Sequence, residues 1–268
     1  VTSYWSTPGS KDGDSVAEGG VADVLRNKTN RVIYSDIGTQ SSLALFTNTL
    51  ATSSLGGATA LASKLGIVED DIDDYLDWAK GKNTDSEKLE DGSIPIMRPD
   101  IFGDPLHSKP LVINYGNSVR IIIGTNAGAL HMFEDKADGN VDETWAFMPK
   151  EFFSNIKPLR DNYSSADKVY GIDGRITSHV EDLNGDGIVN GSDKVWIFFG
   201  LRRGGSSYYA LDISSPTTPK LLWHINSATH TEFSQLGQTW SQPKVAYSKL
   251  NVSSSGDTST AKPVLIFG

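Results

Sequence analysis

The sequence predicts a mainly β fold, a degenerate β-propeller that is incomplete in this chain, preceded by a segment with helices. Short runs rich in β-branched and aromatic residues alternate with turn residues over residues 101–268, and they recur in sets. Residues 1–100 instead carry the wider apolar spacing of helices. Small sheets that repeat along a chain are typical of propeller blades, in which each sheet buries its face against the next.

Residues 1–100 are expected to form a helical and stranded segment that leads into the propeller and packs on it. Apolar spacing predicts helices over Ser15–Asn27 and Gly57–Lys80. Between them, β-branched and aromatic residues predict short strands over Arg31–Ile37 and Leu43–Phe46.

Residues 101–268 contain the predicted blades, two of them full and one partial. In chain order the predicted strands cover Lys109–Asn114, Val119–Gly124, Ala129–Glu134 and Thr144–Pro149, then Ile176–Glu181, Lys194–Gly200, Ser207–Asp212 and Lys220–Ile225, then Ser241–Tyr247 and Pro263–Gly268. The last strand is apolar enough to be covered on both faces. We therefore expect the chain to be a fragment of a longer propeller.

Composition argues against several classes of partner. The chain has 268 residues, a formal net charge of −9, a sequence pI near 5.0 and no cysteine. Nucleic-acid backbones and anionic membrane surfaces require a basic face, so neither is expected as a partner. Without cysteine there are no disulfides, zinc–thiolate sites or thiol nucleophiles. No apolar run is long enough to span a bilayer, which predicts a soluble chain without direct membrane insertion.

One loop carries most of the functional information, and it reads Asp182-Leu-Asn-Gly-Asp-Gly-Ile-Val-Asn-Gly-Ser-Asp193. Asp182, Asn184 and Asp186 place oxygen-bearing side chains at the first, third and fifth positions, as in loops that wrap one calcium ion. Gly187 allows the sharp bend at the sixth position. Ile188 at the seventh offers its backbone carbonyl, and its side chain is expected to turn inward. The pattern predicts a Ca²⁺ site, against the alternative of an ordinary turn rich in Asp, Asn and Gly.

The closing ligand of this loop departs from the usual pattern. Asp193 stands at the twelfth position in place of a bidentate glutamate, so Asp193, Asn190 and a water molecule are all open as the closing ligand. Lys194–Gly200 follows as an apolar strand, so the ion would bridge a β-hairpin and not a pair of helices. A site with weak closure fills at the millimolar calcium found outside cells, which predicts an extracellular location.

Motifs outside the loop resemble a known family. They are Asp104-Pro-Leu-His-Ser-Lys-Pro110, Ile123-Gly-Thr-Asn-Ala-Gly-Ala-Leu-His-Met-Phe133, Trp145-Ala-Phe-Met-Pro-Lys150, Tyr170-Gly-Ile-Asp-Gly174 and Pro263-Val-Leu-Ile-Phe-Gly268. With the calcium loop that follows Gly174, their order is similar to that of the C-terminal propeller of the PilC/PilY family of type IV pilus tip proteins. The resemblance covers roughly residues 17–268, and the combination of motifs is more specific than any one of them.

This resemblance implies a calcium-binding pilus biogenesis protein and adhesin, secreted to the cell surface at the pilus tip in association with the outer membrane. It implies that minor and major pilins are partners, that the chain is not an enzyme, and that Ca²⁺ occupancy regulates pilus extension and retraction, surface attachment, twitching motility and virulence. By position, Asp182, Asn184 and Asp186 match the first ligands of the family loop and Ile188 its backbone ligand. Family members close the loop with an acid near the ninth position, where this chain has Asn190, and the Arg-Gly-Asp motif of some members is absent from the sequence.

Two other classes of function fit parts of the sequence. A quinone-dependent dehydrogenase would share quinoprotein-like, calcium-dependent blades, but it would need a general-base carboxylate beside a central cofactor and more blades. A calcium-stabilised adhesive or carbohydrate-binding propeller unrelated to pili is the other alternative. No catalytic or cofactor-binding residue is predicted, because the histidines lack metal-ligand spacing. Tryptophans on the strands are expected to pack between blades, namely Trp145, Trp196, Trp223 and Trp240.

Overall fold

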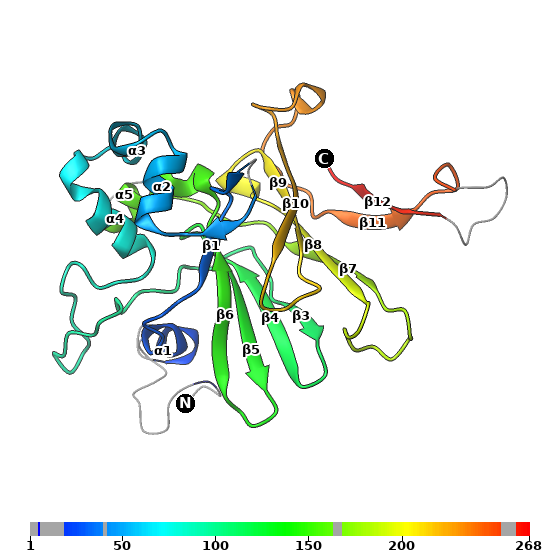
Figure 1. The fold of residues 1–268 in the computed structure, drawn as a ribbon, viewed down its shortest axis with the longest axis horizontal. Coiled ribbons are helices and arrows are strands. Elements are labelled where there is room, and N and C mark those ends of the chain that lie inside the picture. The colour runs from blue at the N-terminus through cyan, green and yellow to red at the C-terminus, as the bar shows by residue number, and fades with distance from the viewer. Residues whose placement is uncertain (1–4, 6–18, 40–41, 163–167, 253–260) are drawn as a thin grey trace.

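Three sheets and a group of short helices make up the computed structural model, which describes residues 5, 19–39, 42–162, 168–252 and 261–268. The first sheet has the strand order β2-β1-β6-β5-β4-β3, the second β10-β9-β8-β7, and the third β11-β12 (Figure 1). None of these sheets closes on itself within the described ranges. The fold is therefore mainly β with some helices, and the closed propeller stays a prediction.

The first sheet is built on an antiparallel meander of four strands. These are β3 (Leu111–Asn114), β4 (Ser118–Gly124), β5 (Leu130–Lys136) and β6 (Val141–Phe147). Along β4 the side chains alternate between buried and partly buried, because successive residues of a strand point to opposite faces. All four strands were predicted, with ends that differ by a few residues.

The second sheet repeats this meander with β7 (Ile176–Glu181), β8 (Lys194–Gly200), β9 (Ser207–Asp212) and β10 (Lys220–Asn226). A short hairpin follows, formed by β11 (Lys244–Tyr247) and β12 (Pro263–Ile266). The two larger sheets share one apolar core, in which fully buried Phe147, Phe199 and Tyr209 contact one another. The first and second sheets therefore bury one face of each against the other.

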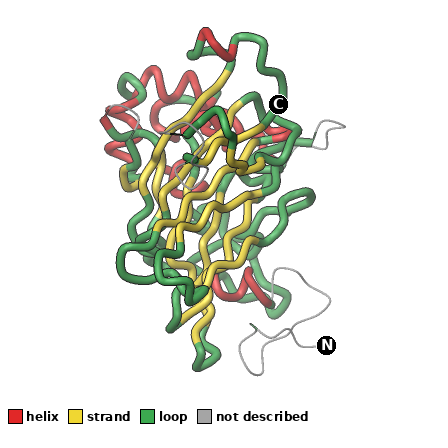
Figure 2. The backbone as a smooth tube through the Cα atoms, turned by 90° about the vertical axis from the view of Figure 1, so that its right-hand side faces the viewer, coloured by secondary structure: helices red, strands yellow, loops and turns green. Residues whose placement is uncertain are grey.

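The N-terminal segment adds two strands to the first sheet, β1 (Ile33–Ser35) and β2 (Ala44–Leu45). Strand β1 lies parallel to β6, with Ile33 opposite Ala146. Its helices are α1 (Gly20–Arg26), α2 (Asn48–Ser54), α3 (Ala58–Leu65) and α4 (Ile72–Ala79), and α5 (Ile156–Asp161) follows β6. Short 3-10 turns cover Glu69–Asp71, Lys150–Asn155, Arg202–Gly204 and Thr231–Phe233. Helices α2–α5 gather at one end of the strands, away from α1 (Figure 2).

The helical stretch predicted over Gly57–Lys80 contains two helices, α3 and α4. Gly66 ends α3 in the left-handed conformation, with a φ of 72°, which stops the helix at its C-cap. Helix α2 was not predicted, since Asn48–Ser54 lacks apolar periodicity and begins instead at a Thr47 side-chain cap. The start of the first predicted helix, Ser15–Glu18, lies outside the described residues. No described helix is both long and apolar enough to cross a bilayer.

A buried ion network fastens the N-terminal segment to the first sheet. Arg31 donates to the two oxygens of Glu143 at 2.6 and 2.8 Å, and its Nη1 donates to the Lys80 carbonyl at 2.9 Å. His131 Nδ1 lies 2.8 Å from Glu143 Oε1. Burial alone would raise the pKa of Glu143, but the charge and hydrogen bonds of Arg31 outweigh it and hold the pKa at about 2. Burial also lowers the pKa of His131.

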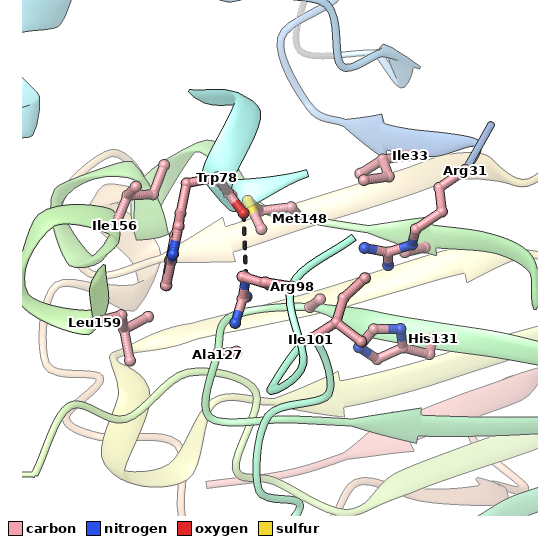
Figure 3. Close-up of a pocket in the computed structure, with 13 residues that line it drawn as sticks. Arg31, Ile33, Trp78, Arg98, Ile101, Ala127, His131, Met148, Ile156 and Leu159 are labelled. Carbon is pink, nitrogen blue, oxygen red and sulfur yellow. Dashed lines mark hydrogen bonds between the residues drawn. The ribbon is translucent and has the colours of Figure 1, made fainter. Parts of the chain in front are cut away.

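Figure 3 shows where Arg31 and His131 of this network lie relative to a second buried arginine. Arg31 and His131 flank a small pocket, and Arg98 and Trp78 lie at its other side. Arg98 Nε donates to the Trp78 carbonyl at 3.4 Å, and its guanidinium stacks 4.0 Å from the centre of the Trp78 ring. The side chains of Arg31 and Arg98, both from the first 100 residues, therefore line one pocket together with His131 of β5.

Candidate calcium site

The predicted calcium loop connects β7 to β8. Glu181, the last residue of β7, pairs with Lys194, the first residue of β8. Asp182 and Asp193 therefore stand on the two sides of the hairpin end, which Figure 1 shows away from the helices α2–α5. The structure agrees with the prediction that the loop spans a β-hairpin and not a pair of helices.

Two glycines shape the first half of the loop. Gly185 and Gly187 have φ angles of 72° and 74°, a region that residues with a Cβ rarely adopt. The Asp182 carboxylate accepts the backbone N–H of Gly185 at 2.7 Å and that of Gly187 at 2.8 Å. The bend predicted at Gly187 is present, and Asp182 holds it in place.

Three side chains converge in the middle of the loop. The amide of Asn184 donates to Asp186 Oδ2 at 3.0 Å, and the amide of Asn190 donates to the same oxygen at 2.9 Å. Asp186 Oδ1 accepts the backbone N–H of Ile188 at 2.8 Å. This backbone hydrogen bond, with those from Asn190 and Asn184, holds the pKa of the exposed Asp186 below its usual value. The cluster of Asn184, Asp186 and Asn190 is therefore negatively charged at neutral pH.

Asp193 occupies a different place from the other predicted ligands. It is 5% exposed, and its two oxygens accept the backbone N–H groups of Leu183 and Asn190, each at 3.0 Å. Both oxygens thus join the start of the loop to its end. Of the two residues predicted as closing ligands, Asn190 is the one whose side chain contacts Asp186.

The most buried residue of the loop's second half is Val189, one position after Ile188, whose side chain was predicted to turn inward. Val189 is 8% exposed and belongs to the core between the two large sheets. Its N–H donates to the carbonyl of Asn114, the last residue of β3, at 2.8 Å. Ile188 is only partly buried. The backbone contact at Val189 connects the loop to the first sheet.

The donor set of the loop fits calcium by its chemistry. Asp182, Asn184, Asp186, Asn190 and the carbonyl of Ile188 offer oxygen donors, which Ca²⁺ prefers and softer metals do not. Over the described ranges, no three His, Cys, Asp or Glu side chains are arranged to hold a metal ion. A site in this loop would therefore depend on amide and carbonyl oxygens as well as on carboxylates.

His107, which lies next to Ser108 in the sequence, has a structural partner elsewhere. Its Nδ1 lies 2.9 Å from Oδ1 of Asp173, whose side chain is fully buried. The Ser108 hydroxyl instead accepts the N–H of Gly124 at 3.0 Å. The two neighbours thus serve separate contacts and do not form a pair of the kind that hydrolases use.

The structure also contains an open surface cavity that the sequence did not indicate. It has a volume of about 650 Å³, and Asp36, Glu151 and His224 are among the residues that line it. Burial raises the pKa of Glu151, although the hydroxyls of Tyr209 and Ser207 donate to its carboxylate. These groups come from β1, the turn after β6, β9 and β10, so no local sequence motif could have found them.

The comparisons with known proteins point to one family. No family model matches the chain. It is 29% identical over 176 residues to the type IV pilus biogenesis factor PilY1 of Pseudomonas aeruginosa (strain UCBPP-PA14), which covers 56% of this chain and 14% of that protein. It is 26% identical over 223 residues to a PilY1 homolog of Xylella fastidiosa (strain Temecula1 / ATCC 700964), which covers 71% of this chain and 16% of that protein.

A solved structure was also matched, the C-terminal domain of Pseudomonas aeruginosa PilY1, with 27% sequence identity and a TM-score of 0.33 over 57% of this chain and 28% of that one. The chain thus spans only a small part of the length of the relatives that it matches. Both relatives have the PilY1 name, and the chain is similarly identical to each, at 29% and 26%. The chain is a relative of the PilY1 family of type IV pilus biogenesis factors.

Proposed function

We propose that this chain is a calcium-binding part of a type IV pilus biogenesis factor. The observation that carries the proposal is the convergence of Asn184, Asp186 and Asn190 in the loop, where all three side chains lie within hydrogen-bonding distance of one another. The names of the relatives support the role in pilus biogenesis. The oxygen donors of the loop support the choice of ion.

The geometry of the loop suggests what its residues do before and after binding. Backbone N–H groups already hold the carboxylates of Asp182 and Asp186, so part of the ordering cost is met in advance. A bound calcium ion would neutralise the negative charge of these two carboxylates. We expect occupancy to order the end of the β7–β8 hairpin, and the Val189 contact would extend this effect to β3.

In the whole protein, we propose that calcium occupancy regulates the balance of pilus extension and retraction, and with it surface attachment and twitching motility. The proposal places the protein at the cell surface, at the pilus tip, with minor and major pilins as partners. The surface or host molecule that it would contact is left open. No enzymatic activity is proposed.

Cells that carry only an Asp182→Ala form of the full-length protein are expected to show fewer surface pili or disturbed twitching, because the loop would lose its first carboxylate. The measurements are pilus counts by electron microscopy and twitching zones on agar. Asp138→Ala is a matched control, since Asp138 is an exposed acid in the β5–β6 turn outside the loop. Normal piliation and motility in the Asp182→Ala cells would overturn the regulatory role.

Asn190→Ala and Asp193→Ala should have different effects. Asn190→Ala is expected to weaken calcium binding and to leave the calcium-free chain as stable as before. Asp193→Ala should lower the free energy of unfolding even without calcium, by about 1 kcal/mol, because two backbone N–H groups lose their acceptor. Calorimetric titration and urea unfolding in a chelator separate these effects. If Asp193→Ala weakens binding more than Asn190→Ala and leaves stability unchanged, Asp193 is the closing ligand.

A further inference from the structure

A surface of two arginines and two aromatic rings lies at the end of β8 opposite the calcium loop. We call Tyr170, Arg202, Arg203 and Trp240 the cation–aromatic surface. The guanidinium of Arg202 lies 4.7 Å from the centre of the Trp240 ring, and that of Arg203 lies 5.8 Å from it and 5.2 Å from the Tyr170 ring. Trp240 is 51% exposed, so the prediction that it packs between blades is wrong.

Hydrogen bonds connect the backbone segments beneath this surface. The Leu201 N–H donates to Thr239 Oγ1 at 2.7 Å, and the Arg202 N–H donates to the Thr239 carbonyl at 3.2 Å. These bonds tie the loop that carries the arginines to the loop that carries Trp240. Gly204 packs against the backbone of Gly171. A Cβ at Gly204 would lie 1.8 Å from the Gly171 carbonyl oxygen, so these two backbone segments leave no room for a side chain.

Arg202 adopts a backbone conformation that is unfavourable for its residue type. Its φ is 53°, in the left-handed region, and its Nη1 donates to the buried Asp173 carboxylate at 3.2 Å. Non-glycine residues held in this region concentrate at ligand-binding and catalytic sites, where the surroundings keep them in place. Here the ion pair with Asp173 and the Thr239 contacts do so.

Arg203 carries a charge that the described residues do not balance. It is exposed, and its Nη1 donates to the Tyr170 hydroxyl at 2.7 Å. No carboxylate lies within ion-pair distance of it in the described ranges, although the chain as a whole has a net charge of −9. In contrast, Arg202 is paired with Asp173, and the nearby Lys168 is paired with Asp104. A planar guanidinium with N–H groups free to donate fits a carboxylate in a two-bond geometry.

We propose that the cation–aromatic surface binds an acidic segment of a partner protein, with Arg203 holding a carboxylate and Trp240 covering an apolar part of the segment. Trp, Tyr and Arg are the residues most enriched where protein interfaces concentrate their binding energy. A protein segment fits better than a polyanion, because nucleic acids and charged polysaccharides need a longer basic stripe than one unbalanced arginine. The surface and the calcium loop lie at opposite ends of β8, so the two proposals can fail separately.

Calorimetric titration of the chain with an N-acetylated peptide that alternates Glu and Leu tests this proposal. Arg203→Gln and Trp240→Ala should each weaken binding by about tenfold or more, since a hydrogen bond to a charged group or a desolvated ring contact contributes at least that factor. Arg203→Lys keeps the charge but not the planar fork, so binding should also weaken. Arg175→Gln is the matched control, because Arg175 is exposed and removing it changes the net charge equally.

The controls distinguish a specific surface from general charge attraction. Unchanged thermal unfolding of the variants shows that they are folded, and a calcium titration of each variant reports on the loop independently. Binding that weakens equally in Arg175→Gln, or that persists in both Arg203→Gln and Trp240→Ala, would overturn the proposal. A titration with an oligouronate tests whether the surface binds a charged polysaccharide. Tighter binding of this sugar than of the peptide would also overturn the proposal. Absence of peptide binding to the intact chain would do the same.

Discussion

Replacing Glu143 with glutamine is expected to lower the free energy of unfolding by about 3–5 kcal/mol, because removing one partner of a buried ion pair leaves the other charge without compensation. Glu143 is fully buried, and the Arg31 side chain, which bonds both of its oxygens, is only 6% exposed. The change would leave the guanidinium buried beside a neutral amide. Urea unfolding of the variant and the natural chain at pH 7 measures the difference.

The neighbouring residue on the same strand supplies the control. Asp142 pairs with Lys28 at 2.6 Å and also connects the N-terminal segment to β6, but its side chain is 48% exposed. Asp142→Asn should therefore cost less than about 1 kcal/mol, the usual contribution of an exposed pair. Equal effects of the two substitutions would contradict the importance of burial for the Arg31–Glu143 pair.

The same network predicts how stability depends on pH. The pKa of Glu143 is about 2 in the folded chain, below its usual value of 4.5, so its contribution is complete above about pH 4.5 and is lost as pH falls toward 2. His131 acts in the same direction. Its pKa is lower in the folded chain than its usual value of 6.5, so as pH falls below 6.5 the unfolded chain binds a proton before the folded chain does, and stability decreases. In Glu143→Gln the fall in stability between about pH 4.5 and 2 should be shallower.

Asp186→Ala is expected to weaken calcium binding by at least about tenfold, since even residues outside the ligand set commonly change metal affinity by that factor. Asp186 contacts both Asn184 and Asn190, so its loss removes the charge at the centre of the cluster. Calorimetry with calcium gives the affinity. Asp138→Ala again serves as the control, and an affinity of Asp186→Ala equal to that of the unmodified chain would move the site away from this loop.

The strands could be predicted because their signals are local. In β4 and β8, β-branched and aromatic residues alternate or run between turn residues, and tertiary packing agrees with these preferences. Helix α2 escaped prediction because its start depends on the Thr47 cap and not on apolar spacing. The division of α3 from α4 depends on the left-handed conformation of Gly66, which composition alone does not reveal.

The candidate calcium site was also readable from the sequence, because the loop is continuous along the chain. The sequence does not show that Asn190 and Asp193 have different roles. That difference arises because the Asp193 carboxylate accepts two backbone N–H groups in the folded chain. The cation–aromatic surface was missed for a different reason. Tyr170, Arg203 and Trp240 come from three loops that only the folded sheet brings together.

Isothermal calorimetry of the purified chain with Ca²⁺ decides whether the Asp182–Asp193 loop binds calcium. We expect saturable binding of one ion, with an affinity suited to millimolar calcium, and loss of that binding in Asp186→Ala. If the intact chain binds no calcium, or if Asp186→Ala binds it as well as the intact chain, the loop is an ordinary turn of the β7–β8 hairpin and does not bind calcium.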